Sequence, residues 1–135
     1  MIDIFSLKVE EIATKIKGSQ LTSVEICKKY IERISKFERD IKAWAYFDKK
    51  VLLEKATEAD DHRRSGKPVG LLHGVPIAVK DIIGTVDMPT ECGTVIRKGK
   101  SYSQNAEIVD LLLSAGAIVM GKTTTSELAY LGPSK

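Results

Sequence analysis

The strongest constraint on the fold of this chain is an apolar run that ends on two adjacent charges, Gly-Leu-Leu-His-Gly-Val-Pro-Ile-Ala-Val-Lys-Asp at residues 70–81. In a strand, alternation places Pro76, Ala78 and Lys80 on one face and branched residues on the other. A strand that is apolar on both faces is typical of a sheet covered by helices on each side. Lys80 lies at the carboxyl end, where open α/β sheets place their ligands, and burial there would favour its neutral amine. The run therefore predicts a buried strand and makes Lys80 a candidate base.

A second strand is expected further along the chain. After a Gly- and Thr-rich loop to about Ser103, the pattern predicts a helix over 106–114 and a strand over 117–120. Strand, loop, helix and strand in this order favour a right-handed βαβ crossover with parallel strands. Residues 66–135 are therefore expected to form an α/β core.

The first part of the chain, residues 1–65, has helical periodicity instead. We expect a first helix over 9–16, and a Thr-x-x-Glu capping box at 22–25 opens a second. An extended piece at 43–47 leads to a third helix over 48–64, whose many charges indicate a solvated face. The second helix carries an apolar stripe at three- and four-residue steps, formed by Cys27, Tyr30, Ile31, Ile34, Phe37 and Ile41.

Composition excludes several classes of protein. The chain has 135 residues, 43% hydrophobic and 29% charged, which is ordinary for one soluble domain. The net charge of +3 is spread beside acidic residues, so no nucleic-acid partner is predicted. Apolar runs stay well below the ~18 residues of a membrane span, and neither a cofactor nor a metal is predicted. Cys27 and Cys92 lack paired spacing and are expected to be free thiols, so the expected location is the cytoplasm.

One motif competes with this interpretation. Residues 116–123 satisfy the phosphate-loop pattern GxxxxGK[ST], which predicts nucleotide binding. Its middle positions, 117–120, are the expected strand, however, so they should pair in a sheet rather than wrap around a phosphate. Lys122 would then follow the strand near Lys80, either lining a site or leading into a helix that a capping box at 124–127 predicts. We favour the helix.

Three other residues carry reactive groups without a pattern that selects them. His62 lies in a charged helical run and is expected at the surface, and His73 precedes Gly74 and is expected to hydrogen-bond within a turn. Cys92 could serve as a thiol nucleophile beside a histidine, but no spacing selects such a pair. A free loop cysteine is the preferred interpretation.

Three blocks of the sequence, at residues 74–81, 88–94 and 115–129, resemble the opening of the amidase signature family in content and order. The family includes amide hydrolases and the amidase subunit of glutamyl-tRNA(Gln) amidotransferase, and the sequence does not separate these two activities. The resemblance implies an α/β fold with a mixed, mostly parallel sheet covered by helices. It also implies a small-molecule amide substrate.

For the site, the resemblance implies a Ser-cisSer-Lys arrangement in which Lys80 is the general base acting through a bridging serine. Thr90, Gly93 and Thr94 match the family's loop near the substrate. The Gly/Ser-rich stretch that supplies both serines is not found before the chain stops at 132–135. We therefore expect a truncated amidase-signature fold, an N-terminal fragment that is inactive alone.

A truncated sheet suggests a second class of function. Uncovered sheet edges and apolar patches promote pairing, so the chain is also a candidate self-associating or partner-binding module. The expected partners are a second copy or a complementary C-terminal fragment. If the missing layer leaves the amine of Lys80 in water, that residue should be an ordinary charged lysine.

Overall fold

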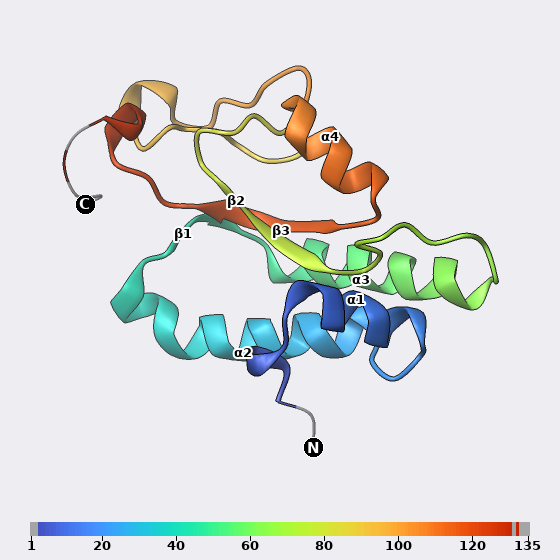
Figure 1. Cartoon of the computed structure of the whole chain (residues 1–135). Coiled ribbons are helices and arrows are strands. Elements are labelled where there is room, and N and C mark those ends of the chain that lie inside the picture. The colour runs from blue at the N-terminus through green and yellow to red at the C-terminus, as the bar shows by residue number, and fades with distance from the viewer. Residues whose placement is uncertain (1–2, 131, 133–135) are drawn as a thin grey trace.

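The computed structural model describes residues 3–130 and 132, which build a three-stranded sheet with helices on both sides (Figure 1). Helices α1 to α3 lie on one side of the sheet, and α4 and the loop after β2 lie on the other (Figure 1). Residues 131 and 133–135 of the predicted core lie outside the described residues. In chain order the elements are η1 (Ile4–Ser6), α1 (Val9–Lys17), α2 (Ser23–Ile41), β1 (Trp44–Phe47), α3 (Lys49–Arg64), β2 (Pro76–Lys80), η2 (Val95–Arg97), α4 (Glu107–Ser114), β3 (Ile118–Thr123) and η3 (Glu127–Ala129).

The sheet has the order β1-β3-β2, with β2 parallel and β1 antiparallel to the central strand β3. The predicted parallel pairing across α4 is therefore confirmed, and the α/β fold class is confirmed as a mixed sheet. Pairing passes from Ile77 opposite Val119 to Ala78 opposite Gly121, so Met120 is an extra residue in β3. Such a one-residue insertion is a β-bulge.

Helix α2 begins where the capping box predicts. The hydroxyl of Thr22 accepts a hydrogen bond from the backbone N–H of Glu25 at 3.1 Å, and the Glu25 carboxylate accepts one from the N–H of Thr22 at 2.8 Å. The predicted apolar stripe becomes more exposed along the helix, and Tyr30, Ile31 and Ile34 in its middle are half-buried. Cys27 is fully buried, whereas Phe37 and Ile41 are 40% and 65% exposed.

A second cap on α2 comes from α3 and was not predicted. Asp60 is buried, and its carboxylate accepts hydrogen bonds from the N–H groups of Ser23 and Val24 at 2.9 and 3.0 Å. A carboxylate suits this position because the N-terminus of a helix carries partial positive charge. The solvated face predicted for the third helix is therefore wrong at Asp60, since one of its acids is a buried link between two helices.

The core is divided by the sheet. On the side of α2 and α3, Cys27 packs in a cluster with Ile118 and Met120. Burial is the main cause that raises the pKa of Cys27 from the usual 9.0 to about 12, and nearby Asp60 adds to the effect. On the side of α4, the buried cluster consists of Val79, Met88, Val109 and Val119.

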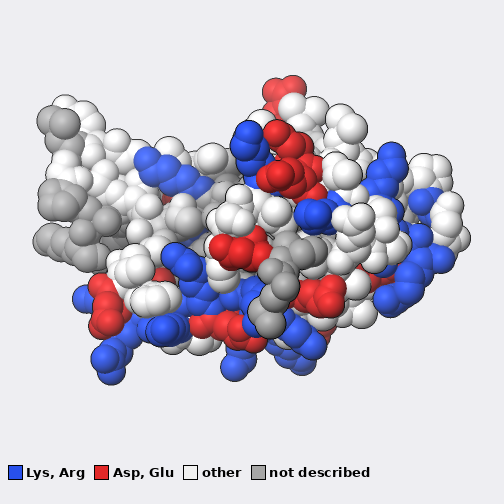
Figure 2. All heavy atoms as spheres, turned by 60° about the horizontal axis from the view of Figure 1, so that its bottom comes forward, with Lys and Arg blue, Asp and Glu red and all other residues white. Residues whose placement is uncertain are grey.

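The face of the molecule that is seen in Figure 2 carries charges of both signs. Lysine and arginine side chains are interspersed with aspartate and glutamate on this face, and neither sign forms a continuous field there. Within residues 3–130, every helix is too short or too polar to cross a bilayer.

Candidate functional site

The carboxyl ends of β2 and β3 bring two lysines to one edge of the sheet, on opposite faces. Val79 pairs with Lys122, and these residues are 4% and 0% exposed. Lys80 pairs with Thr123 and is exposed, as is Ala78 two positions earlier. Because neighbouring residues of a strand point to opposite faces, the loop that buries Val79 and Lys122 leaves Lys80 uncovered. The burial that the apolar run alone suggests for Lys80 is therefore not found, and its exposure agrees with the expectation for a chain that lacks the covering layer.

The buried lysine of this edge is Lys122. Its Nζ donates hydrogen bonds to Thr90 Oγ1 at 2.5 Å and to the carbonyl of Pro89 at 3.3 Å, and it lies 3.7 Å from Asp81 Oδ1. Burial lowers the pKa of Lys122, and the negative charge of Asp81 opposes that change. The amine is thus surrounded by oxygen atoms, which is what a buried ammonium requires.

Asp81 joins this cluster to both strands. Its N–H donates to the carbonyl of Thr123 at 2.9 Å, and its own carbonyl accepts from the N–H of Cys92 at 2.9 Å. Its carboxylate also accepts from the N–H of Glu91 at 3.2 Å. The partner of Asp81 is therefore Lys122, and the ion pair with Lys80 that adjacency in sequence allows is not formed. Sequence reasoning missed this role of Asp81, although a charge that directly follows an apolar strand is a usable signal.

Of the three loop residues that the resemblance assigns to the substrate site, two are turned into the protein. Thr90 is fully buried, and its hydroxyl receives the Lys122 hydrogen bond. Thr94 is 7% exposed, and its hydroxyl donates to Glu127 Oε1 at 2.7 Å. Gly93 is exposed, and its φ of +66° favours glycine. The structure brings this loop beside the ends of both strands, and the substrate role of its residues stays a prediction.

The segment after β3 differs from the prediction. Strand β3 continues through Lys122 to Thr123, so Lys122 does not lead into a helix. Among the described residues after β3, the one helical element is the three-residue η3. Its N-cap Ser126 makes no side-chain cap, and the carboxylate of Glu127 accepts a hydrogen bond from the hydroxyl of Thr94. The predicted capping box at 124–127 is therefore wrong.

The phosphate-loop pattern is not a phosphate loop in this fold. Its middle positions lie in β3, as predicted, and their backbone groups belong to the sheet ladder. Lys122, the lysine of the pattern, is fully buried and bonded to protein oxygens. A lysine in that position cannot reach a bound nucleotide.

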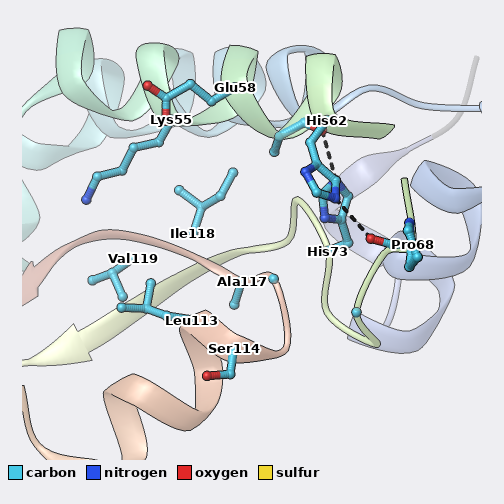
Figure 3. A pocket seen from close by; sticks show the side chains of 13 residues that line it. Lys55, Glu58, His62, Pro68, His73, Leu113, Ser114, Ala117, Ile118 and Val119 are labelled. Carbon is cyan, nitrogen blue, oxygen red and sulfur yellow. Dashed lines mark hydrogen bonds between the residues drawn. The ribbon is translucent and has the colours of Figure 1, made fainter. Parts of the chain in front are cut away.

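A separate pocket of about 540 Å³ lies between α3, α4 and the loop before β2, and Figure 3 shows His62 and His73 close together at one end of it. Their ring centroids are 5.3 Å apart. The Nε2 of exposed His62 bonds the carbonyl of Pro68 at 2.9 Å, and that of buried His73 bonds the carbonyl of Ala59 at 2.8 Å. The hydrogen bond predicted within the turn of His73 is made by its backbone N–H, which donates to the carbonyl of Gly70 at 3.2 Å, and the ring adds a contact to α3.

The remaining titratable groups show no metal or disulfide chemistry. Across residues 3–130, no group of three or more histidine, cysteine or acidic side chains is placed to hold a metal ion. Cys27 and Cys92 are both free, as predicted, and both are buried. Burial of its thiol makes Cys92 a poor candidate for a nucleophile.

Comparison with known proteins gives one consistent result. The family model described as Amidase matches residues 25–134. The AmiD protein of Mycobacterium tuberculosis is 39% identical over 129 residues, which are 96% of this chain and 27% of that protein. A glutamyl-tRNA(Gln) amidotransferase subunit of Streptomyces coelicolor is 34% identical over 129 residues, again 96% of this chain and 26% of the relative. The crystal structure of the peptide amidase from Stenotrophomonas maltophilia superposes with a TM-score of 0.84 at 30% identity, over 93% of this chain and 26% of that one. The chain thus spans about a quarter of the length of its relatives.

Proposed function

Because this chain belongs to the amidase signature family, we propose that it provides the lysine-bearing part of an enzyme that hydrolyses carboxamide C–N bonds. The observation that carries the proposal is the place of Lys80, which is exposed at the carboxyl end of β2 beside the 81–103 loop. Ligands of open α/β sheets bind outside this end of the strands. An amidotransferase that takes its nitrogen from an amide would use the same first step.

In the proposed mechanism, Lys80 is the general base of a Ser-cisSer-Lys arrangement. It accepts the proton of a nucleophilic serine through a bridging serine, and the serine oxygen then attacks the amide carbonyl. A lysine can take a proton only when its amine is neutral, and removal from water favours the neutral form. Since Lys80 is exposed, a further part of the enzyme must cover it before it can act as a base.

The buried cluster beneath the strand ends supports this role without taking part in the chemistry. Lys122 and Asp81 hold the loop after β2 against β3, so the residue that directly follows Lys80 is fixed on both sides. Gly93 is the exposed residue of the three assigned to the substrate loop, and its missing side chain lets the loop pass close to the backbone after β3, since a Cβ would lie 2.6 Å from the carbonyl oxygen of Thr125. Residues 1–135 contain no Gly-Gly-Ser-Ser-like stretch, so the chain by itself is expected to be inactive.

The test is a chimera in which this chain replaces the matching quarter of the peptide amidase from Stenotrophomonas maltophilia. The chimera should release ammonia from a peptide amide, whereas the isolated chain should not. Lys80→Met should abolish turnover. Lys80→Arg should abolish it as well, because a guanidinium keeps its charge but cannot give up its proton at working pH. Lys98→Met, at another exposed lysine, is the matched control and should remain active.

Three results would contradict the proposal or part of it. An active Lys80→Arg chimera would exclude the base role, since only positive charge would then be needed. Equal losses in Lys80→Met and Lys98→Met would indicate a general effect of lost charge. Turnover by the isolated chain would show that the expected inactivity is wrong.

A further inference from the structure

Lys80, the proposed base, is followed directly by a carboxylate, that of Asp81. A carboxylate close to a lysine favours the ammonium form, and an ammonium group cannot accept a proton. An ion pair between these two neighbours would therefore oppose the role proposed for Lys80. Within the described residues no side chain forms an ion pair with Lys80.

The sheet keeps the side chains of Lys80 and Asp81 apart. Exposure alternates at the end of β2, because Val79 and Asp81 are buried and Lys80 between them is exposed. Neighbouring residues of an extended chain point to opposite faces, so Asp81 lies on the face of Val79. The N–H of Asp81 donates to the carbonyl of Thr123 at 2.9 Å, which continues the pairing with β3 and fixes this orientation.

On the buried face the carboxylate of Asp81 meets the ammonium group of Lys122. The register places Lys122 opposite Val79, and its Nζ lies 3.7 Å from Asp81 Oδ1. The side chains of Lys122 and Asp81 are 0% and 3% exposed, so water and salt screen their attraction little. The other titratable groups that act on Lys122 are Cys92 and Asp87, which belong to the same loop after β2.

We propose that Lys122 is a positioning residue for the proposed base, because it holds the carboxylate of Asp81 on the buried face and compensates its negative charge. Lys80 can then lose its proton once the rest of the enzyme covers it. The purpose of this arrangement rests on the proposed function. The arrangement itself does not, since both partners are buried within this chain whatever lies against its open surfaces.

The test is the rate at which acetic anhydride modifies Lys80 in the full chain at a fixed neutral pH, followed by mass spectrometry. Only a neutral amine reacts, so the rate of Lys80 relative to that of Lys98, another exposed lysine, reports how readily Lys80 gives up its proton. Lys122→Met should lower this ratio about threefold, the size expected when one uncompensated charge acts on an exposed one. Lys122→Gln keeps a hydrogen-bond donor for Thr90 and should lower the ratio as well.

Three further variants separate this effect of charge from a loss of structure. Lys122→Met with Asp81→Asn should restore the wild-type ratio, because no uncompensated carboxylate remains. Asp81→Asn alone removes the negative charge, so it should not lower the ratio. Lys55→Met is the matched control, because it also leaves an aspartate of the loop, Asp87, without its lysine, but the side chain of Asp87 is 45% exposed and screened by water. It should keep the wild-type ratio, and circular dichroism should show that all variants are folded.

An unchanged ratio in both Lys122→Met and Lys122→Gln would overturn the proposal. So would a ratio that stays low in the double variant, that falls in Asp81→Asn or that falls equally in Lys55→Met, since each result would indicate disturbed structure rather than charge.

A second measurement uses the chimera with the peptide amidase. Lys122→Met should lower kcat at neutral pH and recover it at higher pH with KM unchanged, whereas a loss that is the same at every pH would indicate a merely structural role and overturn the proposal. Modification of Lys80 requires no turnover. The expected ratios together with an inactive chimera would therefore support this proposal and contradict the proposed function.

Discussion

Replacing Lys122 by methionine tests whether the buried lysine holds the strand ends together. Methionine has a similar volume, so the change removes the charge and its hydrogen bonds but leaves little cavity. It leaves Asp81, only 2% exposed, without its ion-pair partner, and it leaves Thr90 Oγ1 without its donor. Breaking a buried pair on one side costs about 3–5 kcal/mol. Asp81 keeps the hydrogen bond from Glu91, so we expect the low end, about 3 kcal/mol.

The assay is equilibrium unfolding in urea at one fixed protein concentration. With a slope of about 1.5 kcal/mol per M, the expected loss moves the midpoint down by about 2 M. Lys80→Met is the matched control, and it should stay within about 0.5 kcal/mol of the wild type because Lys80 is exposed. Removing both partners, in Lys122→Met with Asp81→Asn, should be milder than the single change, since no unpaired charge is left.

Two outcomes would refute this reasoning. A loss below about 1 kcal/mol for Lys122→Met would mean that Asp81 is adequately satisfied by backbone groups alone. A double variant less stable than Lys122→Met would mean that the packing of these side chains, rather than the charge pair, determines their contribution.

Two further predictions concern the rest of the fold. The free energy of unfolding should fall as the pH rises above 9.0, because the pKa of the Cys27 thiol is 9.0 in the unfolded chain and about 12 in the folded one. Urea titrations from pH 8 to 10 should show that this pH dependence is weaker in Cys27→Ala. A pH dependence that is the same in Cys27→Ala and the wild type would contradict the role of Cys27. Gly74→Ala should destabilise the protein by more than the ~1 kcal/mol expected for Gly66→Ala. Both glycines have a φ of +74°, but only at Gly74 would an added Cβ meet another group, the Ser23 hydroxyl at 2.0 Å. Equal decreases of the melting temperature in the two variants would contradict this close approach.

The helices were predictable because their signals are local. The capping box at Thr22 acts within one turn of the residues that carry it. Asp48, which was placed inside the predicted third helix, is instead the residue that caps α3. Parallel pairing of β2 with β3 was predictable from the order of strand, helix and strand. The pairing of β1 was not predicted, since its four residues carry no signal for which strand they will join.

The site was predictable in location but not in detail. Lys80 was correctly placed at the end of a strand, but its exposure depends on which face the following loop covers, and that is a long-range property. The partners of Lys122 come from a loop that is more than thirty residues earlier in the chain. The burial of Asp60 is also a long-range property. In the sequence Asp60 looks like the solvated acids around it, and it is buried because its carboxylate caps another helix, α2.

The extra residue Met120 determines which side of the sheet carries the buried charge. Ile118 and Met120 face α2 and α3, so strict alternation would send Lys122 to that side as well, into an apolar cluster. The bulge advances the strand by one residue and turns Lys122 to the side of Val79, where Asp81 and Thr90 supply oxygen atoms. Because of this insertion, β3 places Ile118 and Met120 in the layer of α2 and α3 and places the ammonium group of Lys122 in the layer of α4. Deleting Met120 would therefore remove the bulge and still leave Lys122 opposite Val79, whereas straightening the strand with Met120 kept would turn the ammonium group into the apolar layer.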